Sequence, residues 1–144
     1  MSTPALSKLI QKTCDLTIKV SSTTENSYWH TIVQAKNAVN KQYRLLANYT
    51  FGRAQDPYVY PEQKIRLLPF DVLPCNIQIY WKDNADINYP VKEWEQSKWN
   101  LAVRYEEKYD SSGQLIYVYA SYWDQEDAQN SEIHLVELSF NYNI

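Results

Sequence analysis

The chain has 144 residues, of which 44% are hydrophobic, and its 14 basic and 17 acidic side chains give a formal net charge of −3. This length suits a single globular domain, residues 1–144, and the composition excludes a disordered chain. The charge excludes the basic surface of a nucleic-acid-binding protein, and the two glycines argue against a glycine-rich phosphate loop.

The N-terminal residues and the hydropathy of the chain predict its cellular compartment. Residues 1–4 lack the apolar core of a signal peptide, and no stretch approaches the roughly 20 apolar residues of a membrane-spanning helix. The sequence therefore predicts a cytoplasmic protein that is not transmembrane. In a reducing compartment, Cys14 and Cys75 are expected to be buried thiols without a disulfide.

Residues 1–12 are predicted to form an N-terminal arm or a short helix. Thr3 and Pro4 match a helix N-cap followed by proline at the first helical position, and Leu6, Leu9 and Ile10 would share one helix face. Short helices are marginal alone, so the pattern leaves both alternatives open.

Apolar and polar residues then alternate along several segments. The period of two predicts strands at 15–20, 28–33, 43–51, 65–68, 77–81 and 136–144. Residues 34–42 remain open between a helix and a turn. Asp-Pro and Tyr-Pro pairs mark the loop at 53–61, because proline makes the preceding residue extended.

The clearest element is a hairpin within residues 98–124. Trp99, Leu101, Val103 and Tyr105 alternate with polar residues, which predicts a strand with one buried face. Residues 110–113, Asp-Ser-Ser-Gly, supply a tight turn.

The returning strand of this hairpin, residues 115–123, is apolar on both faces. The alternation sets Ile116, Val118 and Ala120 against Leu115, Tyr117 and Tyr119, so both faces would need cover. Altogether the pattern predicts an all-β, mostly antiparallel fold of about eight strands. We expect a β-sandwich or jelly-roll-like barrel with at most one or two short helices.

Aromatic residues at the predicted strand ends are the candidate ligand-binding site. Tyrosine and tryptophan combine an apolar plane with a hydrogen-bonding edge, which suits a sugar face or a lipid headgroup, although such rings also roof cores and fill subunit interfaces. The candidates are Tyr28, Trp29, Tyr58, Tyr60, Tyr89, Trp94, Tyr122 and Trp123.

Two acidic loops offer oxygen ligands for Ca²⁺, but neither matches an EF-hand loop. The weak candidates are Asp83, Asp86, Asp124, Glu126 and Asp127, and ordinary solvated loops are the simpler interpretation.

No other metal and no cofactor is expected. His30 and His134, the only histidines, and the two cysteines lie in no recognisable nucleophile motif, so we predict no catalytic residue.

Three functions fit these patterns. The first is a non-enzymatic, lectin-like or toxin-like protein that presents its aromatic loops to a glycan or a membrane surface. The second is a structural subunit that forms a homo-oligomer or assembly, such as a fibre, a shell or an intracellular crystalline inclusion. The third is an inhibitor or immunity-type protein whose acidic half masks a basic partner, since residues 73–144 hold five basic and twelve acidic side chains, a balance of −7.

Overall fold

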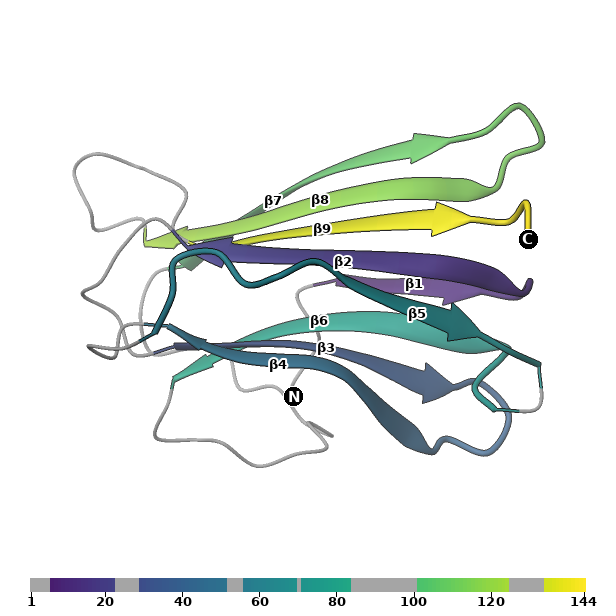
Figure 1. Cartoon of the computed structure of the whole chain (residues 1–144), viewed down its shortest axis with the longest axis horizontal. Helices are drawn as coiled ribbons and strands as arrows, with labels where there is room; N and C mark the ends of the chain where they lie inside the picture. The colour runs from purple at the N-terminus through teal and green to yellow at the C-terminus, as the bar shows by residue number, and fades with distance from the viewer. Residues whose placement is uncertain (1–5, 23–28, 52–55, 70, 84–100, 125–133) are drawn as a thin grey trace.

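The computed structural model describes residues 6–22, 29–51, 56–69, 71–83, 101–124 and 134–144, and at 29, 82, 83, 101–103, 123 and 124 it describes the backbone alone. The described residues form two antiparallel sheets that face each other as a sandwich (Figure 1). Their nine strands are β1 (Leu6–Ile10), β2 (Cys14–Ser22), β3 (Trp29–Asn37), β4 (Tyr43–Phe51), β5 (Gln63–Leu67), β6 (Cys75–Asp83), β7 (Leu101–Tyr109), β8 (Leu115–Asp124) and β9 (His134–Asn141). The predicted all-β class is confirmed.

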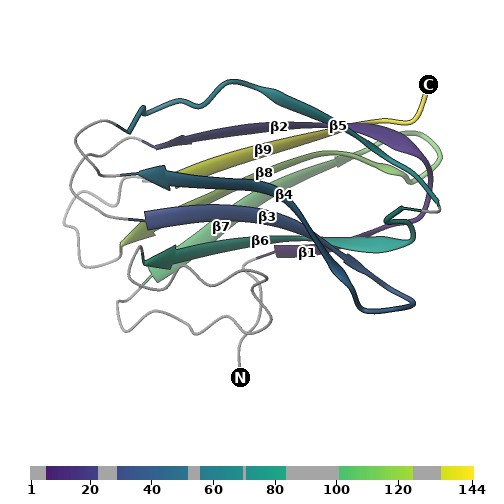
Figure 2. The same cartoon turned by 60° about the horizontal axis from the view of Figure 1, so that its bottom comes forward.

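The two sheets differ in size. One has four strands in the order β1-β6-β3-β4, and the other has five in the order β5-β2-β9-β8-β7. Figure 2 shows the four-stranded sheet in front of the five-stranded one. No helix in the described residues is long and apolar enough to cross a membrane.

Alternate residues of the strands form one core between the sheets. Leu16 and Ile18 of β2 meet Ile77 and Ile79 of β6 there, and all four side chains are at most 1% exposed. Burying a side chain of this size stabilises the folded state by about 1.5–3 kcal/mol. The cysteines lie in the same core as free thiols, and burial raises the pKa of Cys14 to about 11 and that of Cys75 to about 12.

Of the two alternatives that the sequence left open for residues 1–12, the short helix is wrong for the described part of this segment. Residues 6–10 form β1, which pairs with β6 over Leu6↔Ile79 to Ile10↔Cys75. Leu6 and Ile10 are buried in the core, whereas Leu9 lies on the opposite face and is 51% exposed. Pairing with an already buried strand overrides a local helical pattern that is only about two turns long.

Residues 34–42, which the sequence left open, continue β3 to Asn37 and then turn. The Asn37 side-chain oxygen accepts hydrogen bonds from the backbone N–H groups of Val39 and Asn40, at 2.8 and 3.0 Å. This is the local bonding by which asparagine favours a turn over a helix.

The β7–β8 hairpin forms as predicted, but a register shift changes which faces are buried. Lys108 pairs with Tyr117 and Tyr109 pairs with Leu115, so Ile116 is an extra residue. Leu115 therefore lies in the core together with Val118 and Ala120, which corrects the predicted opposition of Leu115 to those two residues. A bulge reverses the face of every residue beyond it, and simple alternation cannot reveal it.

His134 gives the fold a testable dependence on pH. Its side chain is fully buried between Phe51 and Tyr122, with ring centroids 5.7 and 5.8 Å away, and desolvation lowers its pKa to about 3. In the unfolded chain the ordinary pKa is 6.5. Below that pH the unfolded state gains a proton that the folded state does not, so stability falls as the pH falls.

We expect this residue to remove about 2 kcal/mol of stability between pH 6.5 and 5. Urea unfolding at a series of pH values, compared between the native chain and His134→Gln, measures it. The difference between the two free energies of unfolding isolates His134, because every other titrating group is common to both proteins. A difference that stays constant with pH would contradict the buried neutral histidine.

Candidate functional site

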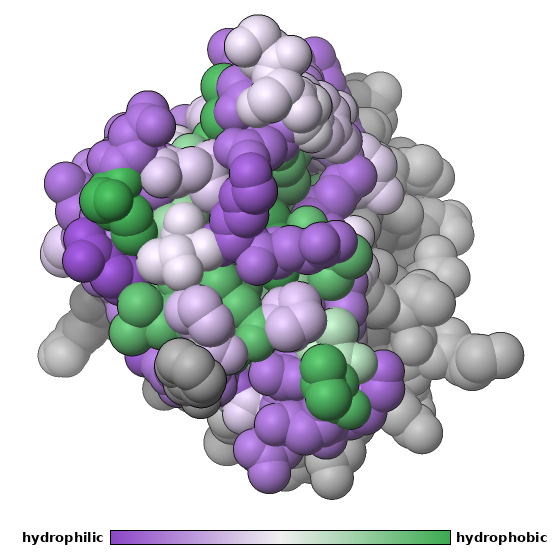
Figure 3. Space-filling model, turned by 90° about the vertical axis from the view of Figure 1, so that its right-hand side faces the viewer, coloured by the Kyte–Doolittle hydropathy of each residue, from purple (hydrophilic) through white to green (hydrophobic). Residues whose placement is uncertain are grey.

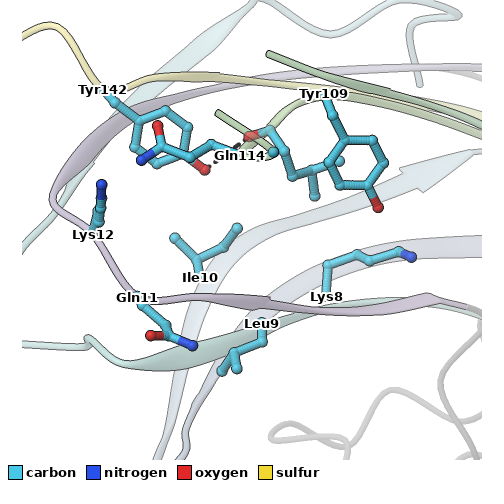
Figure 4. A pocket seen from close by; sticks show the side chains of 10 residues that line it. Lys8, Leu9, Ile10, Gln11, Lys12, Tyr109, Gln114 and Tyr142 are labelled. Atoms are coloured by element: carbon cyan, nitrogen blue, oxygen red, sulfur yellow. Dashed lines mark hydrogen bonds between the residues drawn. The ribbon is translucent and has the colours of Figure 1, made fainter. Parts of the chain in front are cut away.

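A cleft of about 400 Å³ opens where β1 of one sheet faces the β7–β8 hairpin of the other. Figure 4 shows Tyr109 and Tyr142 on either side of Gln114, above Ile10, with Lys8 and Lys12 at the two ends. The lining residues are Lys8, Leu9, Ile10, Gln11, Lys12, Tyr109, Gly113, Gln114, Leu115 and Tyr142.

Two charged residues that point between the sheets form the margin beside this cleft. Lys8 lies between the buried Leu6 and Ile10 on the inward face of β1. Glu107 of β7 is opposite the core residue Val118, so it also faces inward. The Lys8 Nζ atom lies 2.5 Å from Glu107 Oε1, and the ion pair joins the edge strands of the two sheets.

Tyr109 completes this polar arrangement. Its hydroxyl donates a hydrogen bond of 2.7 Å to Glu107 Oε2. Hydrogen bonds from Lys8 and then Tyr109 lower the pKa of Glu107, and the bond to Glu107 raises the pKa values of Lys8 and Tyr109. At neutral pH, the margin therefore carries a charged pair and a neutral tyrosine, with Glu107 as the shared acceptor.

The turn between β7 and β8 fixes one wall of the cleft. Asp110 Oδ1 accepts hydrogen bonds of 2.9 Å from the backbone N–H groups of Ser112 and Gln114. The partners of the Gln114 amide assign its orientation: both of its groups are satisfied when the nitrogen faces Asp110 Oδ2, 3.2 Å away, and the oxygen faces Lys12 Nζ, 2.5 Å away. Gly113 has a φ of +82°, a conformation that glycine adopts without strain.

The other wall residue, Tyr142, is fixed from the C-terminal segment. Its hydroxyl donates a 2.8 Å hydrogen bond to the Leu115 carbonyl oxygen, and burial raises its pKa to about 12. Tyr142 is therefore protonated, and able to donate, throughout the physiological pH range.

Two tyrosine rings remain half exposed along β7. Tyr105 and Tyr109 are on the same face of the strand as Glu107, and they are 50% and 52% exposed. The sequence predicts a buried face at Tyr105, and its exposure is a correction. The opposing strand β1 has five residues against nine in β7, so it cannot cover the whole inward face.

The three proposed aromatic residues whose side chains the structure describes do not form one displayed group. Tyr58 is 44% exposed. Tyr60 is half buried, with its ring stacked on Tyr49 at 4.1 Å and its hydroxyl donating to the Thr50 carbonyl oxygen. Tyr122 is 1% exposed and stacks on Trp81 in the core, which corrects the prediction that its ring is displayed. Tyr122 faces inward because it pairs with the buried His134 at the end of the β8–β9 ladder.

The remaining aromatic candidates lie wholly or partly outside the described residues. Trp29 begins β3 and Trp123 lies near the end of β8, and for both the backbone alone is described. Tyr28, Tyr89 and Trp94 lie outside the described residues.

Much of the proposed calcium site also lies outside the described part of the chain. Asp83 and Asp124 end strands β6 and β8, with only their backbone described, and Asp86, Glu126 and Asp127 fall outside it. Within the described residues, no three His, Cys, Asp or Glu side chains gather in a way that could hold a metal ion.

The groups best suited to acid–base or nucleophilic chemistry are buried apart from the cleft. His30 is 6% exposed, and its Nδ1 lies 2.8 Å from Asn48 Oδ1. His134, Cys14 and Cys75 are fully buried. A thiol whose pKa is raised by burial is a poor nucleophile, because the thiolate is the reactive form.

Sequence reasoning missed the cleft, although one signal pointed toward it. Glu107 occupies an inward position in the alternation of β7, and a charged residue on an apolar face is a known device of edge strands. Lys8 becomes recognisable as its partner only once residues 6–10 are known to be a strand.

The sequence matches no protein-family model, and none of the curated proteins compared with it matches.

The hydrogen bond from Tyr142 to Leu115 should stabilise this end of the sandwich measurably. We expect Tyr142→Phe to lower the free energy of unfolding by about 1 kcal/mol, because the Leu115 carbonyl loses its donor. Urea denaturation measures the change. Tyr105→Phe is the matched control and should change stability by less than about 0.5 kcal/mol, since its exposed hydroxyl has no hydrogen bond in the described residues. Equal effects in the two variants would contradict the assigned role.

Proposed function

We propose that the protein is a non-enzymatic binding module for a glycan and that the cleft beside β7 is its binding site. The observation that supports this proposal is the pair of half-exposed rings, Tyr105 and Tyr109, on either side of the Lys8–Glu107 ion pair. A sugar ring has apolar C–H faces and a rim of hydroxyl groups. It therefore suits a surface that alternates aromatic planes with hydrogen-bonding groups.

The polar groups around the cleft have capacity for such a ligand. The Lys8 ammonium has three donors, one of which is directed to Glu107. The Tyr109 hydroxyl donates its proton to Glu107, and its oxygen retains lone pairs that can accept a hydrogen bond. Gln11 and Gln114 add amide groups that offer donors and acceptors together. A hydroxyl group of a sugar both donates and accepts, so this mixed set matches it.

The same mixture favours a glycan over a membrane surface. Figure 3 looks onto the end of the sandwich nearest the cleft, where hydrophobic residues are interspersed with hydrophilic ones. Insertion into a lipid headgroup layer requires a broader apolar surface than this. Among the described side chains of the earlier aromatic set, Tyr58, beside the end of β2, is the exposed one, and it offers a second surface against which the proposal can be tested.

A glycan array probed with the 144-residue chain, followed by calorimetric titration of the glycans that bind, tests the proposal. We expect Tyr109→Ala to weaken binding by about 5–30-fold, the loss of about 1–2 kcal/mol of ring contact. Tyr109→Phe should retain most of the affinity, because it keeps the ring plane. Circular dichroism of each variant verifies that the fold is intact.

Tyr58→Ala is the matched control, because Tyr58 is exposed to a similar extent and should leave the affinity unchanged. A chain that binds no glycan on the array contradicts the proposed function. Binding that is lost on Tyr58→Ala, Trp94→Ala or Trp123→Ala but retained by Tyr109→Ala would contradict the site and favour the strand-end aromatic residues. Sedimentation with liposomes in the absence of glycan binding would favour a membrane surface instead.

A further inference from the structure

We propose that the outer edge of β7 pairs with β7 of a second copy of this chain, antiparallel and about a two-fold axis through Tyr105. The two five-stranded sheets would then join into one continuous sheet of ten strands. This pairing does not depend on which ligand the cleft binds: it uses Tyr105, whereas Tyr109, which lines the cleft, remains available to a ligand.

Among the described residues, β7 has an open outer edge. It is the last strand of its sheet and, within the described residues, it pairs with β8 and with no other strand (Figure 1). A nine-residue edge presents a row of backbone donors and acceptors to another strand.

The other sheet edges are shorter or already contacted by neighbouring segments. β1 and β5 have five residues each. Along β4, the Tyr60 hydroxyl donates to the Thr50 carbonyl oxygen, and the Tyr49 hydroxyl donates to Gln63 Oε1 at 3.0 Å. Contacts of this kind cover an edge strand.

Symmetry restricts the register. An antiparallel pair of identical strands is related by a two-fold axis normal to the sheet, so each residue meets its counterpart about one central residue. Tyr105 is the midpoint of Leu101–Tyr109, and an axis at Tyr105 pairs all nine residues. The inward faces of both copies stay on the same side of the joined sheet.

Charge favours the same register. With the axis at Tyr105, Arg104 of each copy lies opposite Glu106 of the other, which forms two ion pairs on the exposed face. An axis at residue 104 would set Arg104 against itself, and an axis at residue 106 would set Glu106 against itself and Arg104 against Lys108. Like charges directly opposite each other destabilise a strand pair.

Registers in which the two-fold axis lies further from Tyr105 pair fewer residues of the two strands. An axis at Glu107 pairs Glu106 with Lys108, but it shortens the pairing to the five residues from 105 to 109 and sets Glu107 against itself. Within one copy, Arg104 Nη2 and Glu106 Oε1 are 3.5 Å apart, with both side chains more than half exposed. An exposed pair of this kind contributes little to the stability of one chain.

Tyr105 supplies the apolar part of the contact. Its ring is 50% exposed in one chain and lies at the symmetry axis, so the two rings become direct cross-strand neighbours. Aromatic pairs in this position stabilise antiparallel strands. Residues 104–106, all of them exposed, therefore form the centre of the proposed contact.

Charge reversal tests the pairing. Sedimentation velocity from about 1 µM to about 1 mM, the range in which small interfaces associate, should show a dimer of the native chain. Arg104→Glu and Glu106→Arg should each weaken the dimer at least about tenfold, because each replaces two attractive pairs by two repulsive ones. The double variant, in which the charges are exchanged, should restore it. A native chain that is monomeric throughout, a dimer that both single variants retain, or a double variant that stays monomeric overturns the proposal.

A crosslinking experiment tests the register without relying on charge. The Cα atoms of two cysteines placed by Tyr105→Cys would be about 5 Å apart across the axis, within the Cα–Cα range for a disulfide. Cysteines placed by Lys108→Cys would be separated by six residues along the strands, about 20 Å, and should not crosslink. The native Cys14 and Cys75 are fully buried and do not interfere. Crosslinking of Lys108→Cys, or none of Tyr105→Cys under oxidising conditions, overturns the two-fold axis at Tyr105.

Discussion

The constraint on which the rest of this structure depends is that each sheet must cover the inward face of the other. The central strands meet it fully, since β2 and β9 of one sheet and β3 and β6 of the other contribute core residues that are nearly inaccessible to water. The cover is incomplete at one margin, where the five residues of β1 oppose the nine of β7. The cleft, the ion pair and the half-exposed Tyr105 and Tyr109 all occur at this margin.

The inward charges at the margin follow from the same constraint. An aliphatic side chain at Glu107 would extend the core to an edge that water reaches and that another chain can approach. Lys8 and Glu107 instead neutralise each other between the sheets. Inward-pointing charge is one of the means by which edge strands limit pairing with arbitrary chains. The charges of Arg104 and Glu106, on the opposite face, can favour one specific partner over others.

The fold class could be predicted from sequence because alternation in segments such as 15–20 and 43–51 is a direct consequence of one buried face. Strand β1 could not be predicted from sequence, because its pattern also fits a helix. Only its pairing with β6 decides between a strand and a helix. The register of β8 depends on a single extra residue, Ile116, which alternation does not reveal. The candidate functional site was harder to predict from sequence than the fold. Strand-end position alone did not distinguish the enclosed Tyr122 from the exposed Tyr58, and the cleft combines side chains from segments about 100 residues apart.

The two cysteines have a practical consequence. Cys14 and Cys75 begin strands in opposite sheets, and both are enclosed between them. A thiol-specific reagent can reach either sulfur only when the structure opens around these strand ends, because both residues are 0% exposed in the folded chain. The chain therefore carries two intrinsic reporters of its own opening, and their labelling rates would show whether the sheets separate together or one edge at a time.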